Sequence, residues 1–202
     1  MLVSEVMTGP VVTVPESAPI RQAIRVLYEH DLTAAPVVDA DGRMVGIVSE
    51  ADLLRGEFTA DPRAFTRPVA EPGEAPPARV REVMTSEVLS ARENTDVASL
   101  AERMMAERVK SVPVLDGGRL VGMVSRRDLM RVLTHSDDRV CDDVAAALEG
   151  LVPGASGWDI VVRNGVVTLT GSADALTDRV VSVLARTVPG VSRVTVIDSP
   201  RA

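Results

Sequence analysis

The chain has 202 residues, of which 46% are hydrophobic and only 2% aromatic, and its formal net charge is −7 at pH 7. Residues 1–134 hold 16 Lys and Arg against 20 Asp and Glu, and residues 135–202 hold 6 against 9. Neither part is therefore a basic surface for nucleic acid or anionic lipid, and the scarcity of aromatic residues argues against base-stacking platforms.

The chain also lacks the residues of several chemistries. Its one cysteine, Cys141, excludes an intrachain disulfide framework, and the neighbouring Asp142 and Asp143 favour an unreactive thiol. The two histidines, His30 and His135, lie near neither each other nor the cysteine in sequence, so we expect no metal site, no cofactor and no catalytic set. The protein is not expected to be an enzyme.

The start of the chain has no basic region followed by an apolar stretch of signal length. No run approaches the roughly 18 apolar residues of a membrane span. We therefore expect a soluble, cytoplasmic protein for which contact with a membrane is not favoured.

The segment Val3–Arg55 recurs as Val80–Arg131. The opening Val-Ser-Glu-Val-Met-Thr returns as Val-Arg-Glu-Val-Met-Thr, and the closing Gly-Ile-Val-Ser-Glu-Ala-Asp-Leu returns as Gly-Met-Val-Ser-Arg-Arg-Asp-Leu. The offset is constant apart from one residue missing at the Asp41–Gly42 turn. A loop-tip deletion inside a collinear repeat indicates tandem copies of one folded unit, which would pack together and leave clefts between them.

The first copy has a clear order of local signals. The β-branched residues 11–14 predict a short extended piece, and Ser17 is positioned to cap a helix whose apolar residues recur at helical spacing over 20–27. The remaining predicted elements are strands over residues 35–39 and 44–48 and a helix over residues 50–56 that Ser49 opens.

The second copy repeats this order, with Asn94 or Thr95 as the cap of its first helix. Its predicted strands cover residues 111–115 and 119–124, and Ser125 opens its last helix. Each unit is thus expected to be a three-stranded sheet flanked by two helices. The apolar helical faces of Ile20–Leu27 and Val97–Met105 suggest self-association.

Residues 57–79 separate the two copies and contain five prolines, which favours a long extended linker. A lid over a bound ligand is the alternative. Phe58 and Phe65, the two phenylalanines of the chain, lie in this segment and are expected to pin it to a core.

After the repeats the pattern changes to helix, hairpin, helix and strand. The hairpin has the turn Asn164–Gly165, which is the strongest short hairpin signal in the chain. The second helix is expected to face inward with Leu176, Val180, Val183 and Leu184. The predicted elements are a helix over residues 137–148, strands over 159–162 and 166–170, a helix over 173–187 and a strand over 191–197.

The repeated motifs resemble the CBS domain, which usually occurs as a tandem pair called a Bateman module. The likeness rests on Val-Met-Thr, an internal Pro-Val and the closing Gly-x-x-Ser-x-x-Asp in both copies, and it covers about residues 1–134. It implies two β-α-β-β-α units, at residues 1–56 and 80–134, packed as a pseudo-symmetric pair. It also implies binding of adenosine nucleotides or related adenosyl compounds in the clefts, a sensing role, and disc-like homodimers.

The closing motif has a chemistry of its own. Ser49 precedes the free amides of a helix N-terminus, where an anion such as phosphate is stabilised, and Asp52 is placed to accept two hydroxyls of a ribose. The alternative is a variant capping box in which Asp takes the place of Glu. Ser125 and Asp128 have the same two interpretations.

The two sites differ in charge. Glu50 and Ala51 follow Ser49, and His30–Asp31 precede the first-copy strand. Arg126 and Arg127 follow Ser125, and Arg108 and Lys110 precede the second-copy strand. Because guanidinium groups bind phosphate in a fork, we predict that the Asp128 site prefers phosphate-rich nucleotides, unless these side chains only solvate a helix face.

The resemblance implies further contacts by position. The strand edge that usually reads the adenine corresponds to Thr33, Ala34 and Pro36 in the first copy and to Lys110, Ser111 and Pro113 in the second. Thr8 and Thr85, at the start of each copy, correspond to residues that line the same clefts.

The C-terminal segment resembles the BON domain over about residues 136–199. The likeness rests on Asn-Gly-Val-Val-Thr-Leu-Thr-Gly at residues 164–171 and Pro-Gly-Val-Ser-Arg-Val at residues 189–194. It implies phospholipid or partner binding, although the net charge of this part, 6 cations against 9 anions, argues against anionic bilayers and favours a protein partner. Trp158 is a candidate contact residue or a core residue.

The predicted fold class is α/β, with two α+β-type CBS-like units and a small αββαβ BON-like domain. We expect a regulatory protein that binds AMP, ADP, ATP or S-adenosylmethionine between its CBS-like units and signals through its C-terminal domain. The alternatives are a constitutive adaptor with vestigial clefts and a phospholipid-binding protein that acts through the BON-like domain.

Overall fold

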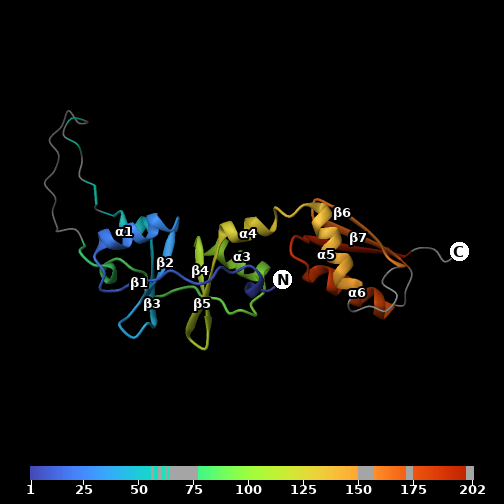
Figure 1. Ribbon diagram of the computed structural model, residues 1–202, viewed down its shortest axis with the longest axis horizontal. Coiled ribbons are helices and arrows are strands. Elements are labelled where there is room, and N and C mark those ends of the chain that lie inside the picture. The colour runs from blue at the N-terminus through green and yellow to red at the C-terminus, as the bar shows by residue number, and fades with distance from the viewer. Residues whose placement is uncertain are drawn as a thin grey trace.

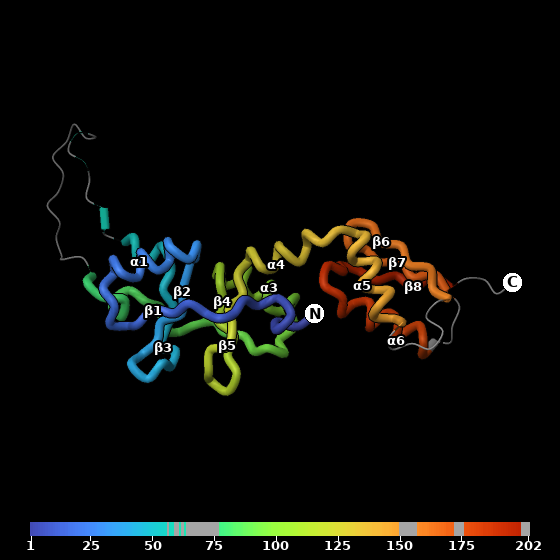
Figure 2. The backbone as a smooth tube through the Cα atoms, viewed as in Figure 1, coloured from blue at the N-terminus to red at the C-terminus, as the bar shows by residue number. Residues whose placement is uncertain are grey.

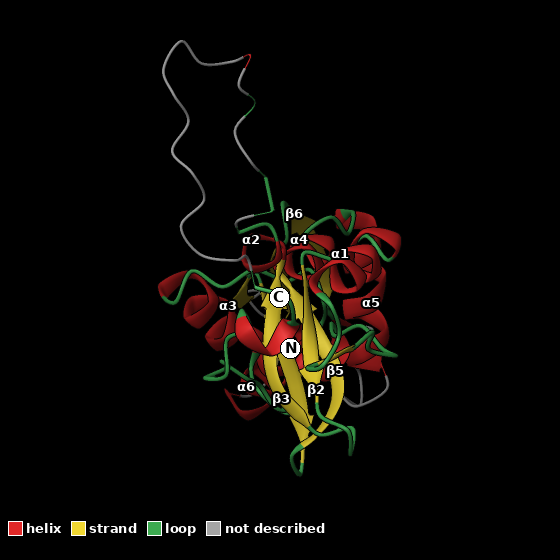
Figure 3. Cartoon of the chain, turned by 90° about the vertical axis from the view of Figure 1, so that its left-hand side faces the viewer, coloured by secondary structure: helices red, strands yellow, loops and turns green. Residues whose placement is uncertain are grey.

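The computed structural model describes residues 1–55, 57–58, 61, 63, 77–149, 157–171 and 175–198. The two repeats and the C-terminal domain follow one another along the long axis of the molecule (Figure 1). Viewed along that axis, strands β2, β3 and β5 lie in the middle with helices around them (Figure 3). Most of the expected linker at residues 57–79, Phe65 included, lies outside the described residues, and Phe58 is 80% exposed rather than pinned to a core.

The first unit contains a three-stranded sheet of order β1-β2-β3, in which β1 is parallel and β3 antiparallel to β2. The helical spacing of Ile20, Ala23 and Leu27 buries all three on one face of α1. Pro19 precedes α1 and no side chain caps it, so the expectation that Ser17 caps this helix is wrong. The elements are β1 (Val14–Pro15), α1 (Ile20–Glu29), β2 (Ala34–Val38), β3 (Met44–Ser49) and α2 (Glu50–Leu53).

The second unit has a two-stranded sheet, and the third strand is reduced to a single parallel bridge between Ala91 and Val114. Asp96, rather than Asn94 or Thr95, caps α3, since its carboxylate accepts from the Ser99 amide at 3.0 Å. Thr95 instead accepts from the Arg92 amide at 2.9 Å. The elements are α3 (Val97–Ala106), β4 (Ser111–Asp116), β5 (Arg119–Ser125) and α4 (Arg126–Val132).

Each unit is completed by the first residues of the other copy. Val3 and Val6 are buried in the core of the second unit, beside Leu100 and Met104, whereas Val80 is buried in the core of the first. Figure 2 shows the N-terminus beside α3, at the far end of the second unit from β1. The two repeats therefore share their cores and form one body.

Two strand glycines permit this exchange. A Cβ atom on Gly46 of β3 would lie 2.8 Å from the carbonyl oxygen of Thr85, and a Cβ atom on Gly122 of β5 would lie 2.5 Å from the Sδ atom of Met7. Each strand is thus crossed by the Val-Met-Thr segment of the other copy. The two halves of the repeat motif meet between copies, and the glycine is needed for that close approach.

The C-terminal domain packs α5 and α6 against a sheet of order β6-β7-β8, with β6 antiparallel and β8 parallel to β7. This αββαβ order confirms the expected architecture. Trp158 packs against Gly171 and belongs to the core. The elements are α5 (Asp137–Glu149), β6 (Asp159–Arg163), β7 (Val166–Gly171), α6 (Ala175–Thr187) and β8 (Arg193–Asp198).

The buried face of α6 differs from the expected one. Leu176 is 73% exposed and Val183 60% exposed, whereas Val181 and Ala185 are fully buried. Apolar residues recur at helical spacing along two adjacent faces of this helix. The face that contains Ala185 is the one that packs against the core, because a small side chain permits close approach. The prediction that Leu176, Val180 and Val183 face inward is therefore wrong, and Leu184 is partly buried.

No helix in the described part of the chain combines the length and apolar character needed to cross a membrane.

Cys141 lies in α5, and its thiol donates to the Ile160 carbonyl at 3.5 Å. Burial raises the pKa of this thiol, and the carboxylates of Asp142, Asp138 and Asp159 raise it further. The thiol is therefore held in its unreactive neutral form at pH 7.

The glycine contacts predict unequal costs of substitution. We expect Gly46→Ala to lower the free energy of unfolding by about 1–3 kcal/mol, the usual cost of overpacking, because the Thr85 backbone cannot move aside. Gly122→Ala should cost less, since its nearest neighbour is the flexible end of Met7. Urea unfolding measures both, with Gly157→Ala as the control, because a Cβ atom there meets nothing within 4 Å. Equal losses for Gly46→Ala and Gly122→Ala would contradict this explanation.

Candidate functional site

A capping box opens the last helix of each repeat. At α2, the Ser49 amide and hydroxyl donate to Asp52 Oδ2 at 3.0 and 2.6 Å, and the Asp52 amide donates to Ser49 Oγ at 3.4 Å. The other oxygen, Asp52 Oδ1, accepts no hydrogen bond from a described residue. The capping box therefore uses only one oxygen of this carboxylate.

The box at α4 has the same geometry and two further contacts. The Ser125 amide and hydroxyl donate to Asp128 Oδ2 at 2.9 and 2.6 Å. On the other oxygen, Oδ1, Asp128 accepts from the Thr8 hydroxyl at 3.2 Å and forms an ion pair with Arg131 at 3.3 Å. The Asp128 side chain is 14% exposed, so this carboxylate is a largely desolvated acceptor with four donor groups from three residues around it.

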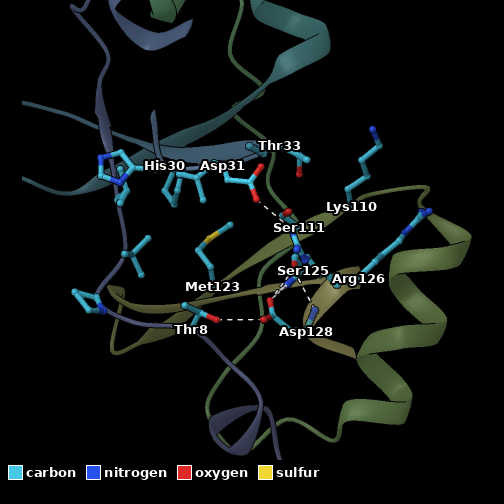
Figure 4. Close-up of a pocket in the computed structure, with 17 residues that line it drawn as sticks. Thr8, His30, Asp31, Thr33, Lys110, Ser111, Met123, Ser125, Arg126 and Asp128 are labelled. Atoms are coloured by element: carbon cyan, nitrogen blue, oxygen red, sulfur yellow. Dashed lines mark hydrogen bonds and ion pairs between the residues drawn. The ribbon is translucent and has the colours of Figure 1, made fainter. Parts of the chain in front are cut away.

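A cleft of about 570 Å³ lies above Asp128, within the range typical of small-molecule sites. Figure 4 shows Thr8 and Asp128 on one side of it and His30, Asp31 and Thr33 on the opposite side. The lining residues are Thr8, Pro10, Val11, Val12, His30, Asp31, Leu32, Thr33, Ala34, Pro36, Lys110, Ser111, Met123, Ser125, Arg126, Arg127 and Asp128.

A second cleft, of about 360 Å³, lies at Asp52 and is related to the first by the repeat. Thr85 occupies here the place that Thr8 has in the Asp128 cleft, because its backbone pairs with Ile47 as that of Thr8 pairs with Met123. The lining residues are Thr33, Ala34, Ile47, Ser49, Glu50, Ala51, Asp52, Thr85, Glu87, Val88, Leu89, Arg108, Val109, Lys110 and Ser111.

Each cleft is built from both units, and this corrects the predicted distribution of charge. His30 and Asp31 line the Asp128 cleft, and Arg108 lines the Asp52 cleft, the reverse of their order along the chain. Asp31 lies just after α1 and Arg108 just after α3, and both residues have a left-handed backbone conformation, with φ of 52° and 57°. Glycine would adopt this backbone conformation at less cost. At these two positions the conformation places a charged side chain at the rim of the other unit's cleft.

Four of the six predicted adenine-reading residues lie in the wall between the clefts. Thr33, Ala34, Lys110 and Ser111 line both clefts, and Pro36 lines the Asp128 cleft. Pro113 lines neither, and its carbonyl instead accepts from the amide of Ala91 at 3.0 Å.

The two arginines after Ser125 have different environments. The guanidinium of Arg126 donates to the carbonyls of Val109 at 3.0 Å and Met104 at 3.4 Å, so it is held by the end of α3. Arg127 instead forms an ion pair with Asp31 across the cleft at 3.1 Å, and both side chains are more than 80% exposed. Arg127 is therefore the more available of the two for an anion, since an exposed ion pair contributes little.

Arg131 contacts the motif carboxylate of Asp128, and the sequence interpretation missed this contact. Its guanidinium contacts Asp128 and the carbonyl of Val6, both at 3.3 Å. The i,i+3 spacing from Asp128 on a predicted helix is the signal that would have found it.

In the described part of the chain, no three His, Cys, Asp or Glu side chains are grouped so as to hold a metal ion.

Two repeats that share their cores and form two related clefts define a tandem module with two clefts. The family model of the CBS domain matches residues 3–57 and 80–135, and the family model of the BON domain matches residues 136–196. The chain thus belongs to the CBS domain family, with a pair of CBS domains followed by a BON domain.

Curated relatives match the CBS pair. The uncharacterized protein MJ1426 of Methanocaldococcus jannaschii is 30% identical over 154 residues, which cover 66% of this chain and 91% of that protein. The homoserine O-acetyltransferase of Methanohalobium evestigatum is 28% identical over 133 residues, which cover 65% of this chain. That match spans only 24% of the acetyltransferase.

Solved structures match the same region. The CBS domain pair of protein MJ0100, in complex with 5′-methylthioadenosine and S-adenosyl-L-methionine, has a TM-score of 0.53 and 27% identity, and covers 65% of this chain and 94% of that chain. CBSX2 in complex with AMP has a TM-score of 0.52 and 26% identity, and covers 64% of this chain and 93% of that chain.

The capping boxes predict a cost that is independent of any ligand. We expect Ser49→Ala and Ser125→Ala each to lower the free energy of unfolding by about 0.5–2 kcal/mol, because each removes the oxygen that accepts from an N-terminal helix amide. The matched control is Ser99→Ala, whose exposed hydroxyl lies inside α3 and should change stability by less than about 0.5 kcal/mol. Thermal unfolding of the three ligand-free variants is the measurement, and an unchanged Ser125→Ala would show that the box contributes nothing.

Proposed function

We propose that this protein is a non-catalytic, cytoplasmic sensor that binds adenosine nucleotides or a related adenosyl compound in its CBS clefts and relays its state through the BON domain. The observation that carries the proposal is the Asp128 carboxylate, which is nearly buried at the side of a 570 Å³ cleft with one oxygen held by Ser125 and the other facing Thr8. AMP, ADP, ATP and S-adenosylmethionine are the candidate ligands.

The chemistry of the cleft fits such a ligand. A carboxylate accepts two hydrogen bonds from vicinal hydroxyls, as a ribose presents them, and charge-assisted bonds of this kind are the stronger ones. Pro36 and Met123 offer apolar surface for a base, and Thr33 and Ser111 offer polar groups beside it. The adenosyl ligands of MJ0100 and the AMP of CBSX2 support the same ligand class here.

Thermal unfolding of the full chain against AMP, ADP, ATP, S-adenosylmethionine and NAD tests this proposal. A ligand at about a hundred times its dissociation constant adds roughly 2.7 kcal/mol to the free energy of unfolding, enough to raise the midpoint by a few degrees. We expect at least one compound to do so, and Asp52→Ala together with Asp128→Ala to abolish the effect.

Asp96→Ala is the control, because it weakens the cap of α3 at a residue that lines neither cleft. If no compound raises the midpoint at millimolar concentration, the clefts are structural and the adaptor hypothesis replaces this one. Vesicle association of the full chain, without any adenosyl ligand, would instead favour the phospholipid hypothesis.

We also propose that the Asp128 cleft prefers phosphate-rich nucleotides. It is lined by Lys110, Arg126 and Arg127 against two carboxylates, whereas the Asp52 cleft has two cations against Glu50, Asp52 and Glu87. In the Asp128 cleft a phosphate can replace the exposed Asp31 carboxylate as the partner of Arg127.

The arginines of the two clefts provide a matched test. We expect Arg127→Ala to weaken ATP binding at least about tenfold and S-adenosylmethionine binding much less, because a charge-assisted hydrogen bond contributes about 1.5–3 kcal/mol. Arg108→Ala, at the rim of the other cleft, should leave the tighter ATP site unchanged. Calorimetric titration measures both, and a larger loss for Arg108→Ala would refute the proposed preference.

Self-association is part of the proposal, although the apolar faces that first suggested it are not available. Ile20, Ala23, Leu27, Leu100 and Met104 are buried in the cores of their own units. The large apolar side chains that remain exposed on the same helices are Tyr28, at 87%, and Met105, at 53%. These two residues are the candidates for a homodimer contact.

A further inference from the structure

We infer that the Asp128 cleft, and not the Asp52 cleft, sets the orientation of the C-terminal domain. The inference rests on the proposed function, since it names the regulation of the same site. It is carried by α4, the helix that begins at the Asp128 capping box and ends against the C-terminal domain.

Helix α4 is short and well anchored at both ends. Its seven residues, Arg126–Val132, span about 10 Å. Ser125 and Asp128 close its first turn at the cleft, and Val132 at its other end is buried in the core of the second unit. Because α4 has only seven residues, a displacement of its first turn tilts the helix as a unit about the buried Val132.

The connection from α4 to α5 is held by hydrogen bonds throughout. The Leu133 amide donates to the Met130 carbonyl at 3.0 Å, and the Thr134 hydroxyl donates to the Arg131 carbonyl at 2.7 Å. Ser136 then accepts the amides of Arg139 and Val140, at 3.3 and 3.0 Å, at the start of α5. The four residues between the helices are thus a structured turn and not a free hinge.

Two turns of the C-terminal domain pack against the connection between α4 and α5. A Cβ atom on Gly190, whose φ is 95°, would lie 3.3 Å from His135 Cβ and 3.5 Å from the carbonyl oxygen of Val132. The carboxylate of Asp137 accepts the amides of Asn164 and Gly165 at 2.7 and 2.9 Å. His135 Nδ1 is buried at this contact and has no hydrogen-bond partner among the described residues.

Some contacts of α4 with the rest of the CBS pair are ones that a nucleotide would exchange. Arg127 is paired with Asp31 of the first unit at 3.1 Å, and a phosphate competes for this guanidinium. Thr8 and Arg131 both contact Asp128 Oδ1, the oxygen that ribose hydroxyls would use. The free and bound states therefore differ in the contacts of α4, which is the condition for a ligand to shift an equilibrium between orientations.

The Asp52 cleft has no comparable route. Its helix α2 ends at Leu53, and the chain then continues to Glu57, which is held to Arg21 of α1 at 2.8 Å. The second unit lies between α2 and the C-terminal domain (Figure 1). Binding at Asp52 can reach that domain only through the wall that the clefts share.

Distances between spin labels on the full chain test the inference. Both labels replace exposed residues, Glu102→Cys on α3 and Arg179→Cys on α6, in a Cys141→Ser background. We expect AMP or S-adenosylmethionine to shift the interlabel distance distribution, the shift to persist in Asp52→Ala, and the shift to vanish in Asp128→Ala. A Gly-Ser-Gly-Ser insertion after Thr134 should remove the shift while ligand binding, measured by thermal unfolding, remains.

The outcomes separate the inference from the proposed function. If neither compound stabilises the protein, the proposed function fails and the inference fails with it. If a compound stabilises both the starting protein and Asp52→Ala but the distances stay unchanged, the inference alone is overturned. A shift lost in Asp52→Ala and kept in Asp128→Ala also overturns it, because the other cleft would then be in control.

Discussion

The structure depends on one exchange, in which the first residues of each repeat are buried in the core of the other. Val3 and Val80 have no exposed surface, and Val6 has almost none. Burying one such side chain stabilises the folded chain by about 1.5–3 kcal/mol relative to exposure. This is a large fraction of the stability of a unit of about 50 residues, because so small a unit buries a smaller share of its surface than a larger domain does. Neither repeat therefore has a complete core without the other. The two copies are bound to fold as one body, and any ligand between them acts on a shared structure.

The clefts follow from the same exchange. The chain that leaves Val6 must cross β5, and it does so at Gly122, where Thr8 pairs with Met123 and reaches Asp128. The equivalent crossing at Gly46 brings Thr85 to the Asp52 cleft. The motif residues at the two ends of a repeat thus meet their counterparts across copies. Thr8 and Asp128, which are 120 positions apart in the sequence, form the floor of one cleft, although each repeat contains both a threonine and an aspartate of the motif.

Local signals were enough to predict most elements, and they failed where packing between elements decides. The Asn164–Gly165 hairpin and the buried face of α1 follow from turn chemistry and helical spacing, and both are as expected. On α6, two apolar series lie one residue apart, and only contact with α5 and the sheet selects the one with Val181 and Ala185. The positions of Asp31 and Arg108 were assigned to the wrong clefts because order along the chain does not show that each cleft borrows its rim from the other unit.

Identical motif residues do not make equivalent sites, and the cause is the length of a helix. Arg55 and Arg131 occupy the same position of the repeat, three residues after the motif aspartate. Helix α4 continues to Val132, so Arg131 stays in helical register with Asp128 and pairs with it, whereas α2 ends at Leu53 and Arg55 does not pair with Asp52. The extra turn of α4 is also the turn that carries the C-terminal domain. Because coupling between two sites is reciprocal, a partner that holds this domain in one orientation would change the nucleotide affinity of the Asp128 cleft by the same factor as the nucleotide changes affinity for the partner.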